Sequence, residues 1–198
     1  MEINNADGEI IPEIPDIPKE IKDAINNNNL AIFIGAGVSR LVKCTSWQDL
    51  AHNLLKLCRD KGLLQFVEYN ALDKDSDNKK LISIAYGLLK QGYESDFYAK
   101  LKEALTPNMD GNTGIFKKLY NLGTTFITTN ADECFDGMFE SEGNIVCDFT
   151  SQEVLPENRK LYHIHGSIKD KDSLVFTTSQ YLKRYSDTNF QRFLRKLF

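Results

Sequence analysis

The stretch that decides the fold is LAIFIGAGVS, residues 30–39. Its apolar run ends abruptly in Gly35-Ala36-Gly37, and Ser39 follows two positions later. Such a run predicts a strand buried on both faces, then a tight turn into a helix. Glycines let the backbone adopt positive φ and approach a ligand, while the helix start presents N–H groups to it. We therefore predict an α/β fold with a nucleotide cradle over Gly35, Ala36, Gly37, Val38 and Ser39.

The glycine pattern departs from the usual dinucleotide fingerprint G-x-G-x-x-G, because Arg40 stands where the third glycine would be. An ordinary strand–helix turn is the alternative interpretation of this motif taken alone. Two later stretches give the nucleotide interpretation its weight.

The first is TFITTNAD, residues 125–132, where a β-rich run stops at Asn130 and Asp132. The apolar residues at 134, 135, 138 and 139 predict a helix after it. Ligands of open α/β sheets sit beyond the carboxyl ends of strands, so both polar residues are expected beside Gly37. The alternative is that they only cap the helix.

The second is LYHIHGS, residues 161–167, a predicted strand that ends in His165-Gly166. The run SLVFTT, residues 173–178, predicts another strand after it. The glycine would allow a substrate to approach His165 closely, which favours a functional role. For His163 we expect a partly buried, hydrogen-bonded ring outside the catalytic set. A metal site at these two histidines is possible on a strand, but no third histidine or carboxylate cluster accompanies them.

In this order GAGVS, TTNAD and HIHGS resemble the sirtuin (SIR2) superfamily, and more narrowly the SIR2-like NADase domains of bacterial anti-phage defence proteins. The resemblance begins at Leu30 and implies a Rossmann-like three-layer domain with a mainly parallel sheet. It also implies that the helical region at about 47–122 is the insertion that covers an NAD pocket.

The resemblance assigns roles residue by residue. It implies that the glycine-rich turn holds the pyrophosphate of NAD, that Asn130 lies beside the nicotinamide ribose and that Asp132 binds the carboxamide. His165 would be the catalytic base or a ribose ligand. The residues implied are catalytic Asn130 and His165, with NAD contacts from Gly35, Ala36, Gly37, Val38, Ser39, Thr129, Asp132, Gly166 and Ser167.

Some positions depart from deacetylating sirtuins. Residues 40–50 read RLVKCTSWQDL instead of continuing the turn with G-I-P-D-F-R, and their S-W-x-x-L element resembles the defence branch. Thr129 replaces the usual Gln. Ala131 replaces a large residue and would enlarge the nicotinamide end of the pocket.

The four cysteines, at 44, 58, 134 and 147, form no C-x-x-C pair. A zinc site like that of deacetylases needs two such pairs, so we expect no zinc and no other metal. Isolated cysteines and no signal peptide predict a reducing, cytoplasmic location.

The composition is that of a soluble globular domain. The chain has 198 residues and a formal net charge of −4, which indicates neither a nucleic-acid groove nor a membrane anchor. No apolar run approaches the roughly 20 residues of a membrane span.

The two ends of the sequence suggest further contacts. Prolines at 12, 15 and 18 predict an extended arm over residues 1–18, with a disordered leader as the alternative. Residues 19–198 would form the NAD-binding domain. An apolar stripe at 190, 193, 194, 197 and 198 predicts an amphipathic helix that needs covering. We expect the chain to be the N-terminal part of a longer polypeptide, a homo-oligomer with further domains or a partner that senses infection.

The resemblance implies an NAD⁺ glycohydrolase that releases nicotinamide and ADP-ribose, with NAD as substrate and an abortive-infection role. An NAD-dependent protein deacylase and a non-catalytic nucleotide sensor or scaffold are the alternatives.

Overall fold

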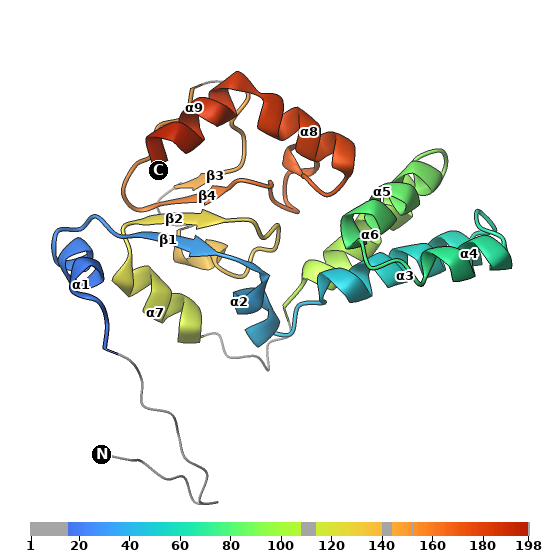
Figure 1. Ribbon diagram of the computed structural model, residues 1–198, viewed down its shortest axis with the longest axis horizontal. Coiled ribbons are helices and arrows are strands. Elements are labelled where there is room, and N and C mark those ends of the chain that lie inside the picture. Colours follow the sequence, from blue (N-terminus) through green and yellow to red (C-terminus); the bar gives the residue numbers. More distant parts are fainter. Residues whose placement is uncertain (1–15, 108–113, 140–143, 152, 198) are drawn as a thin grey trace, which may run out of the picture.

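The computed structural model describes residues 16–107, 114–139, 144–151 and 153–197. Within them lies a four-stranded sheet in the order β1-β2-β4-β3, with every neighbouring pair parallel. The strands are β1 (Ala31–Ile34), β2 (Thr125–Thr128), β3 (Ile145–Val146) and β4 (Lys160–His163). This confirms the predicted parallel α/β sheet, and it brings the carboxyl ends of β1, β2 and β4 to one edge (Figure 1).

Strand side chains alternate between two cores. Phe126 of β2 and Leu161 of β4 face one side of the sheet, and Ile127 and Tyr162 face the other. On the first side lie α2 (Ala36–Leu41) and α7 (Gly114–Leu122). On the second lie α8 (Thr178–Ser186) and α9 (Thr188–Leu197), so the three expected layers are present (Figure 1).

The first strand differs from its prediction. Ile34 is buried, but Phe33 is 53% exposed, so β1 is not buried on both faces. The reason is position: β1 is an edge strand of the described sheet, and only its Ile32/Ile34 face packs on a core. An apolar run therefore identified the strand but not its place in the sheet.

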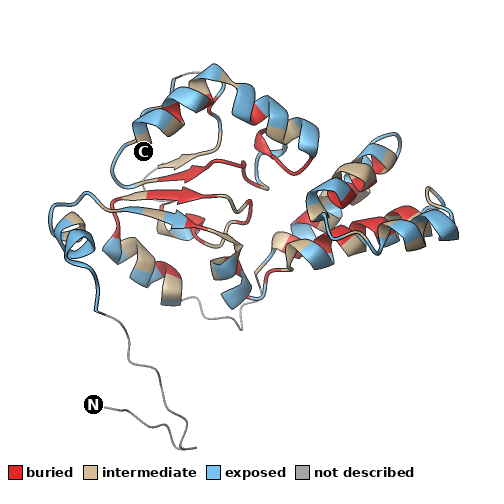
Figure 2. Ribbon diagram, viewed as in Figure 1, coloured by how far each residue is buried: buried red, intermediate tan, exposed pale blue. Residues whose placement is uncertain are grey.

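The helical region consists of two parts. Four helices have their own core, coloured red in Figure 2: α3 (Trp47–Asp60), α4 (Phe66–Leu72), α5 (Asn78–Leu89) and α6 (Glu94–Leu105). Leu54, Leu81 and Leu101 are fully buried between them. By contrast α7, which also falls within 47–122, packs against the sheet through Phe116. The bundle itself therefore covers residues 47–105.

Two predicted elements are wrong. After Asp132 the chain forms turns and a short 3₁₀ helix (Asp136–Met138) instead of an α-helix, because Phe135 and Phe139 turn inward together against Phe126. The expected strand at 173–178 is an extended segment that joins no sheet. It follows a 3₁₀ turn (Lys171–Ser173), and its residues 174–176 are buried between the bundle and the sheet.

The C-terminal stripe is covered within the chain. Phe190 and Phe193 of α9 are completely buried, and the Phe193 ring centroid lies 4.8 Å from those of Phe149 and Tyr162. The expectation that this stripe needs an outside partner is therefore wrong for these two residues.

The N-terminal arm lies largely outside the described residues. Its last part, residues 16–18, is exposed and leads into α1 (Lys19–Asn26). Among the helices of the described ranges, none combines the length and apolar character needed to cross a membrane.

Candidate active site

A cavity of about 410 Å³ lies at the carboxyl edge of β1 and β2, between α2 and the base of the helical bundle. Its volume is within the range of small-molecule sites. The lining residues come from α2, the loop after it, the start of α3, the turn after β2 and two single positions: Ala36, Gly37, Ser39, Arg40, Cys44, Thr45, Ser46, Trp47, Gln48, Leu50, Leu105, Asn130, Ala131, Asp132 and Phe176.

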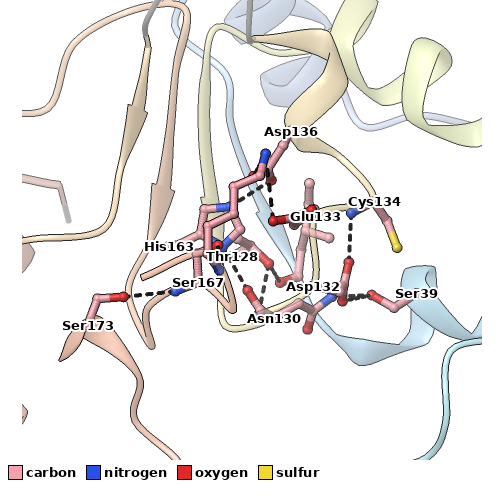
Figure 3. Close-up of polar contacts among 12 residues, drawn as sticks. Ser39, Thr128, Asn130, Asp132, Glu133, Cys134, Asp136, His163, Ser167 and Ser173 are labelled. Carbon is pink, nitrogen blue, oxygen red and sulfur yellow. Dashed lines mark hydrogen bonds and ion pairs between the residues drawn. The ribbon is translucent and has the colours of Figure 1, made fainter. Parts of the chain in front are cut away.

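Three of the predicted site residues form one hydrogen-bonded chain in this wall (Figure 3). Asn130 Nδ2 donates to Ser39 Oγ at 2.7 Å, and Ser39 Oγ donates to Asp132 Oδ2 at 2.6 Å. Ser39 and Asp132 are each 5% exposed. The serine uses its hydroxyl both as acceptor and as donor, so it fixes the orientation of the amide and of the carboxylate together.

The strand ends that carry these residues are tied to each other. Thr128 Oγ1 donates to the carbonyl of Ile34 at 3.1 Å and accepts the backbone N–H of Asn130 at 2.9 Å. The Asp132 side chain also accepts the N–H of Cys134, which is the capping contact expected of it, made here to a turn. Capping and a role in the cavity are therefore compatible for this residue.

The glycines of the turn do not have the positive φ that was predicted for them. Gly35 has φ −112° and ψ −179° and caps α2, and Gly37 does not have positive φ either. A Cβ on either glycine would meet nothing within 4 Å. Gly37 therefore serves the cavity by leaving space in its wall, while Val38 packs into the core beneath α2.

His163 is held in a buried pair with Asp136. Its Nδ1 lies 2.9 Å from the carbonyl oxygen of Asn130, and its Nε2 lies 2.9 Å from Asp136 Oδ1. Both side chains are 1% exposed. A carbonyl oxygen can only accept, so the ring donates from Nδ1 to Asn130 and holds Nε2 against the Asp136 carboxyl. The buried, hydrogen-bonded ring expected for His163 is confirmed, and its contact supports the backbone of Asn130.

His165 lies at the same sheet edge but does not line the cavity. Its Nε2 is 2.8 Å from the hydroxyl of Tyr185 on α8, and the ring packs against Tyr181. Burial, followed by the charge of nearby Arg184, lowers the pKa of His165 to about 4, while a hydrogen bond to the Thr129 backbone opposes the shift. His165 is thus neutral at pH 7 and adjoins the residue before Asn130.

Gly166 and Ser167 serve the turn that follows. Gly166 has φ +78°, and the space beside it is occupied by the backbone of Ser173. The backbone N–H of Ser167 donates to Ser173 Oγ (Figure 3). The close approach expected of a substrate at Gly166 is therefore taken by the protein's own chain.

Two thiols meet beside the Asp132 carboxylate. The Sγ atoms of Cys44 and Cys134 are 3.6 Å apart, and all four cysteines are free. The contact between these thiols raises the pKa of Cys134 and lowers that of Cys44. Burial and the Asp132 charge raise the Cys134 value further.

Comparison with known proteins agrees with this architecture. Residues 124–198 match the family described as SIR2-like domain. It is also 27% identical over 177 residues to "NAD(+) hydrolase ThsA" of Acinetobacter baumannii (strain 532279), an alignment that covers 83% of this chain and 32% of that protein. The chain thus spans about a third of the length of the curated relative it matches.

Several residues of the cavity wall were not predicted as site residues. Trp47 and Phe176 pack with ring centroids 5.2 Å apart, and Arg40 is the only cationic side chain among the described lining residues. The S-W-x-x-L element was an available signal for Ser46, Trp47 and Leu50. Phe176 gave none, because only the tertiary fold brings the segment after β4 to the cavity.

Proposed function

We propose that this chain is the catalytic domain of an NAD⁺ glycohydrolase, which cleaves the nicotinamide–ribose bond and yields nicotinamide and ADP-ribose. The observation that carries the proposal is the Ser39–Asn130–Asp132 chain of hydrogen bonds in a cavity at the strand ends. The similarity to an NAD(+) hydrolase supports the choice of substrate.

For this reaction the site would need mainly to position the substrate and the water and to present ordered polar groups to the charge that develops. Nicotinamide leaves as a neutral group while positive charge develops on the ribose, and water attacks the face that it vacates. Asn130 would orient the ribose and the water. Its Nδ2 is already committed to Ser39, whereas its Oδ1 has no hydrogen bond within the described part of the chain. Asp132 would hold the carboxamide.

The phosphates would lie on the α2 side of the cavity. Gly37 leaves room in that wall, and the exposed Arg40 guanidinium lies on it. An arginine beside a pyrophosphate donates strong, charge-assisted hydrogen bonds. We therefore assign Arg40 to the pyrophosphate, together with the backbone of Gly35, Ala36 and Gly37.

His165 would bind a ribose hydroxyl or accept a proton. Its lowered pKa keeps the ring neutral, as an acceptor must be. Its Nε2 is engaged by Tyr185 in this structure, so substrate would have to replace that hydroxyl. The backbone around the His165 side chain, at Thr129, Gly166 and Ser167, would hold that side chain in place.

The proposed biological role is abortive infection in anti-phage defence, in the cytoplasm, by a homo-oligomer with further domains or a sensing partner. Its support is the resemblance of the three strand-end motifs to defence NADases. A cell with an always-active NADase would lose its NAD, so activity must be gated. Light scattering on the purified protein measures the assembly.

The decisive experiment incubates the purified protein with NAD, with and without an acetylated peptide, and measures nicotinamide. Release without peptide supports the hydrolase. Release only with peptide would indicate a deacylase, and binding without products a sensor. Either result contradicts the proposal.

Matched variants test the site itself. We expect Asn130→Ala and His165→Ala each to reduce NAD cleavage by roughly a hundredfold or more in a folded protein. Arg40→Gln should raise KM, whereas Lys43→Gln, an exposed cation outside the cavity, should not. Wild-type turnover in both alanine variants would show that the site is misassigned.

A further inference from the structure

We propose that Cys44, Asp132 and Cys134 form a binding site for a thiophilic divalent cation such as Zn²⁺. The two Sγ atoms lie 3.6 Å apart, and the two sulfurs and a carboxylate oxygen all lie within 4.8 Å of one another. Cys44 and Asp132 are buried and Cys134 is half-buried. The cysteines are 90 positions apart in the sequence and meet because the loop after α2 reaches the turn after β2.

The spacing of the sulfurs fits a tetrahedral ion. With Zn–S bonds of about 2.3 Å and a tetrahedral angle, two thiolate ligands are about 3.8 Å apart. The observed separation of 3.6 Å is close to this value. Two thiols and a carboxylate are also ligand types that Zn²⁺ takes.

Asp132 has capacity for an ion. One of its oxygens accepts from Ser39 and the other from the backbone N–H of Cys134, and a carboxylate offers about four lone-pair positions. No cationic side chain of the described residues forms an ion pair with it. An ion at this position would supply the positive charge that the buried carboxylate lacks.

The site would be reached from the cavity. Cys44 and Asp132 both line it, so three protein ligands would leave the fourth position for water. One consequence rests on the proposed function: an ion that holds Asp132 competes with the nicotinamide carboxamide, so Zn²⁺ should inhibit NAD cleavage.

Cobalt spectroscopy tests the site without using NAD. Reduced, metal-free protein is titrated with Co²⁺, and we expect thiolate-to-cobalt charge-transfer absorption together with the intense visible bands of tetrahedral Co²⁺. Cys44→Ser and Cys134→Ser should each remove much of this absorption and weaken Zn²⁺ binding, measured against a chromophoric chelator, by at least about tenfold. Asp132→Asn should weaken binding but keep the thiolate absorption.

Cys147→Ser is the matched control, because this thiol lies outside the cluster. It should bind Co²⁺ and Zn²⁺ as the wild type does, and circular dichroism checks that each variant is folded. If Cys44→Ser does not fold, the half-buried Cys134→Ser decides. A wild-type protein without thiolate–cobalt absorption, or an equal loss in Cys147→Ser, would overturn the proposal. Failure to cleave NAD would leave these spectra unchanged, so the two proposals fail separately.

Discussion

At the residue scale, burial decides the protonation state of His165. His165 is 8% exposed and sits between two tyrosines and a buried arginine. A cationic ring would there lose its hydration and face Arg184, so the neutral form is favoured. His163, two positions earlier, has the opposite environment because a buried carboxylate faces it. Two histidines at the end of one strand thus have different partners, a carboxylate for His163 and a tyrosine hydroxyl for His165.

This environment predicts how stability depends on pH. The unfolded His165 has an ordinary pKa of 6.5, and the folded value is about 4. Below pH 6.5 the His165 ring of the unfolded state gains a proton that the folded state does not accept. The contribution of His165 to the free energy of unfolding is therefore complete above pH 6.5 and is lost as the pH falls toward 4. The loss is about 3 kcal/mol. Urea unfolding of the wild type and His165→Gln should show a steeper fall in the wild type, and parallel curves would contradict this account.

At the element scale, the connection from β4 to α8 is fixed by backbone packing. Val175 donates its N–H to the carbonyl of His165, and Arg184 donates to the carbonyl of Ser173. Gly166 lies against this returning segment with positive φ. The turn therefore holds His165 in place through main-chain contacts instead of through a strand pair.

We expect Gly166→Ala to destabilise the protein by about 2–4 kcal/mol, from left-handed backbone strain and from the clash with Ser173. Urea unfolding measures the change. Gly37→Ala is the matched control, because its Cβ would meet nothing within 4 Å and its φ is not positive. The control should fold with wild-type stability, and an equal loss in both variants would contradict the assignment.

At the scale of the whole molecule, α9 closes the second face of the sheet. Its two buried phenylalanines pack on Phe149 and Tyr162, whose rings belong to the same chain. The helix is therefore part of the core, and its two buried phenylalanines are not evidence for assembly.

Phe193→Ala should consequently lower stability by about 3–5 kcal/mol and leave the oligomeric state of the folded protein unchanged. Leu182→Ala, at a position 69% exposed on α8, should change stability by less than about 0.5 kcal/mol. Urea unfolding and light scattering give the two readings. A dissociated but equally stable Phe193→Ala protein would place the stripe at an interface.

The sequence by itself determined which residues stand at the strand ends. Apolar runs identified β1, β2 and β4. The carboxyl ends of parallel strands lie at one edge of the sheet, so the sequence predicts that Gly37, Asn130 and Asp132 lie close together there. Local chemistry suffices for this because strand ends and glycine turns are encoded by neighbouring residues. The period-two alternation in β2 and β4 also follows from sequence.

Only the tertiary structure decided the contacts between distant segments. Ser39 binds Asp132 across 93 positions, and Cys44 meets Cys134 across 90. The exposure of Phe33 depends on β1 being an edge strand, and the burial of Phe193 depends on α9 folding over β4. Residues 174–176 carry a strand-like sequence but join no sheet, because the space they fill lies between the bundle and the sheet. Strand or helix propensity is a property of one segment alone. Burial and strand pairing depend also on the surfaces that the rest of the chain places against that segment.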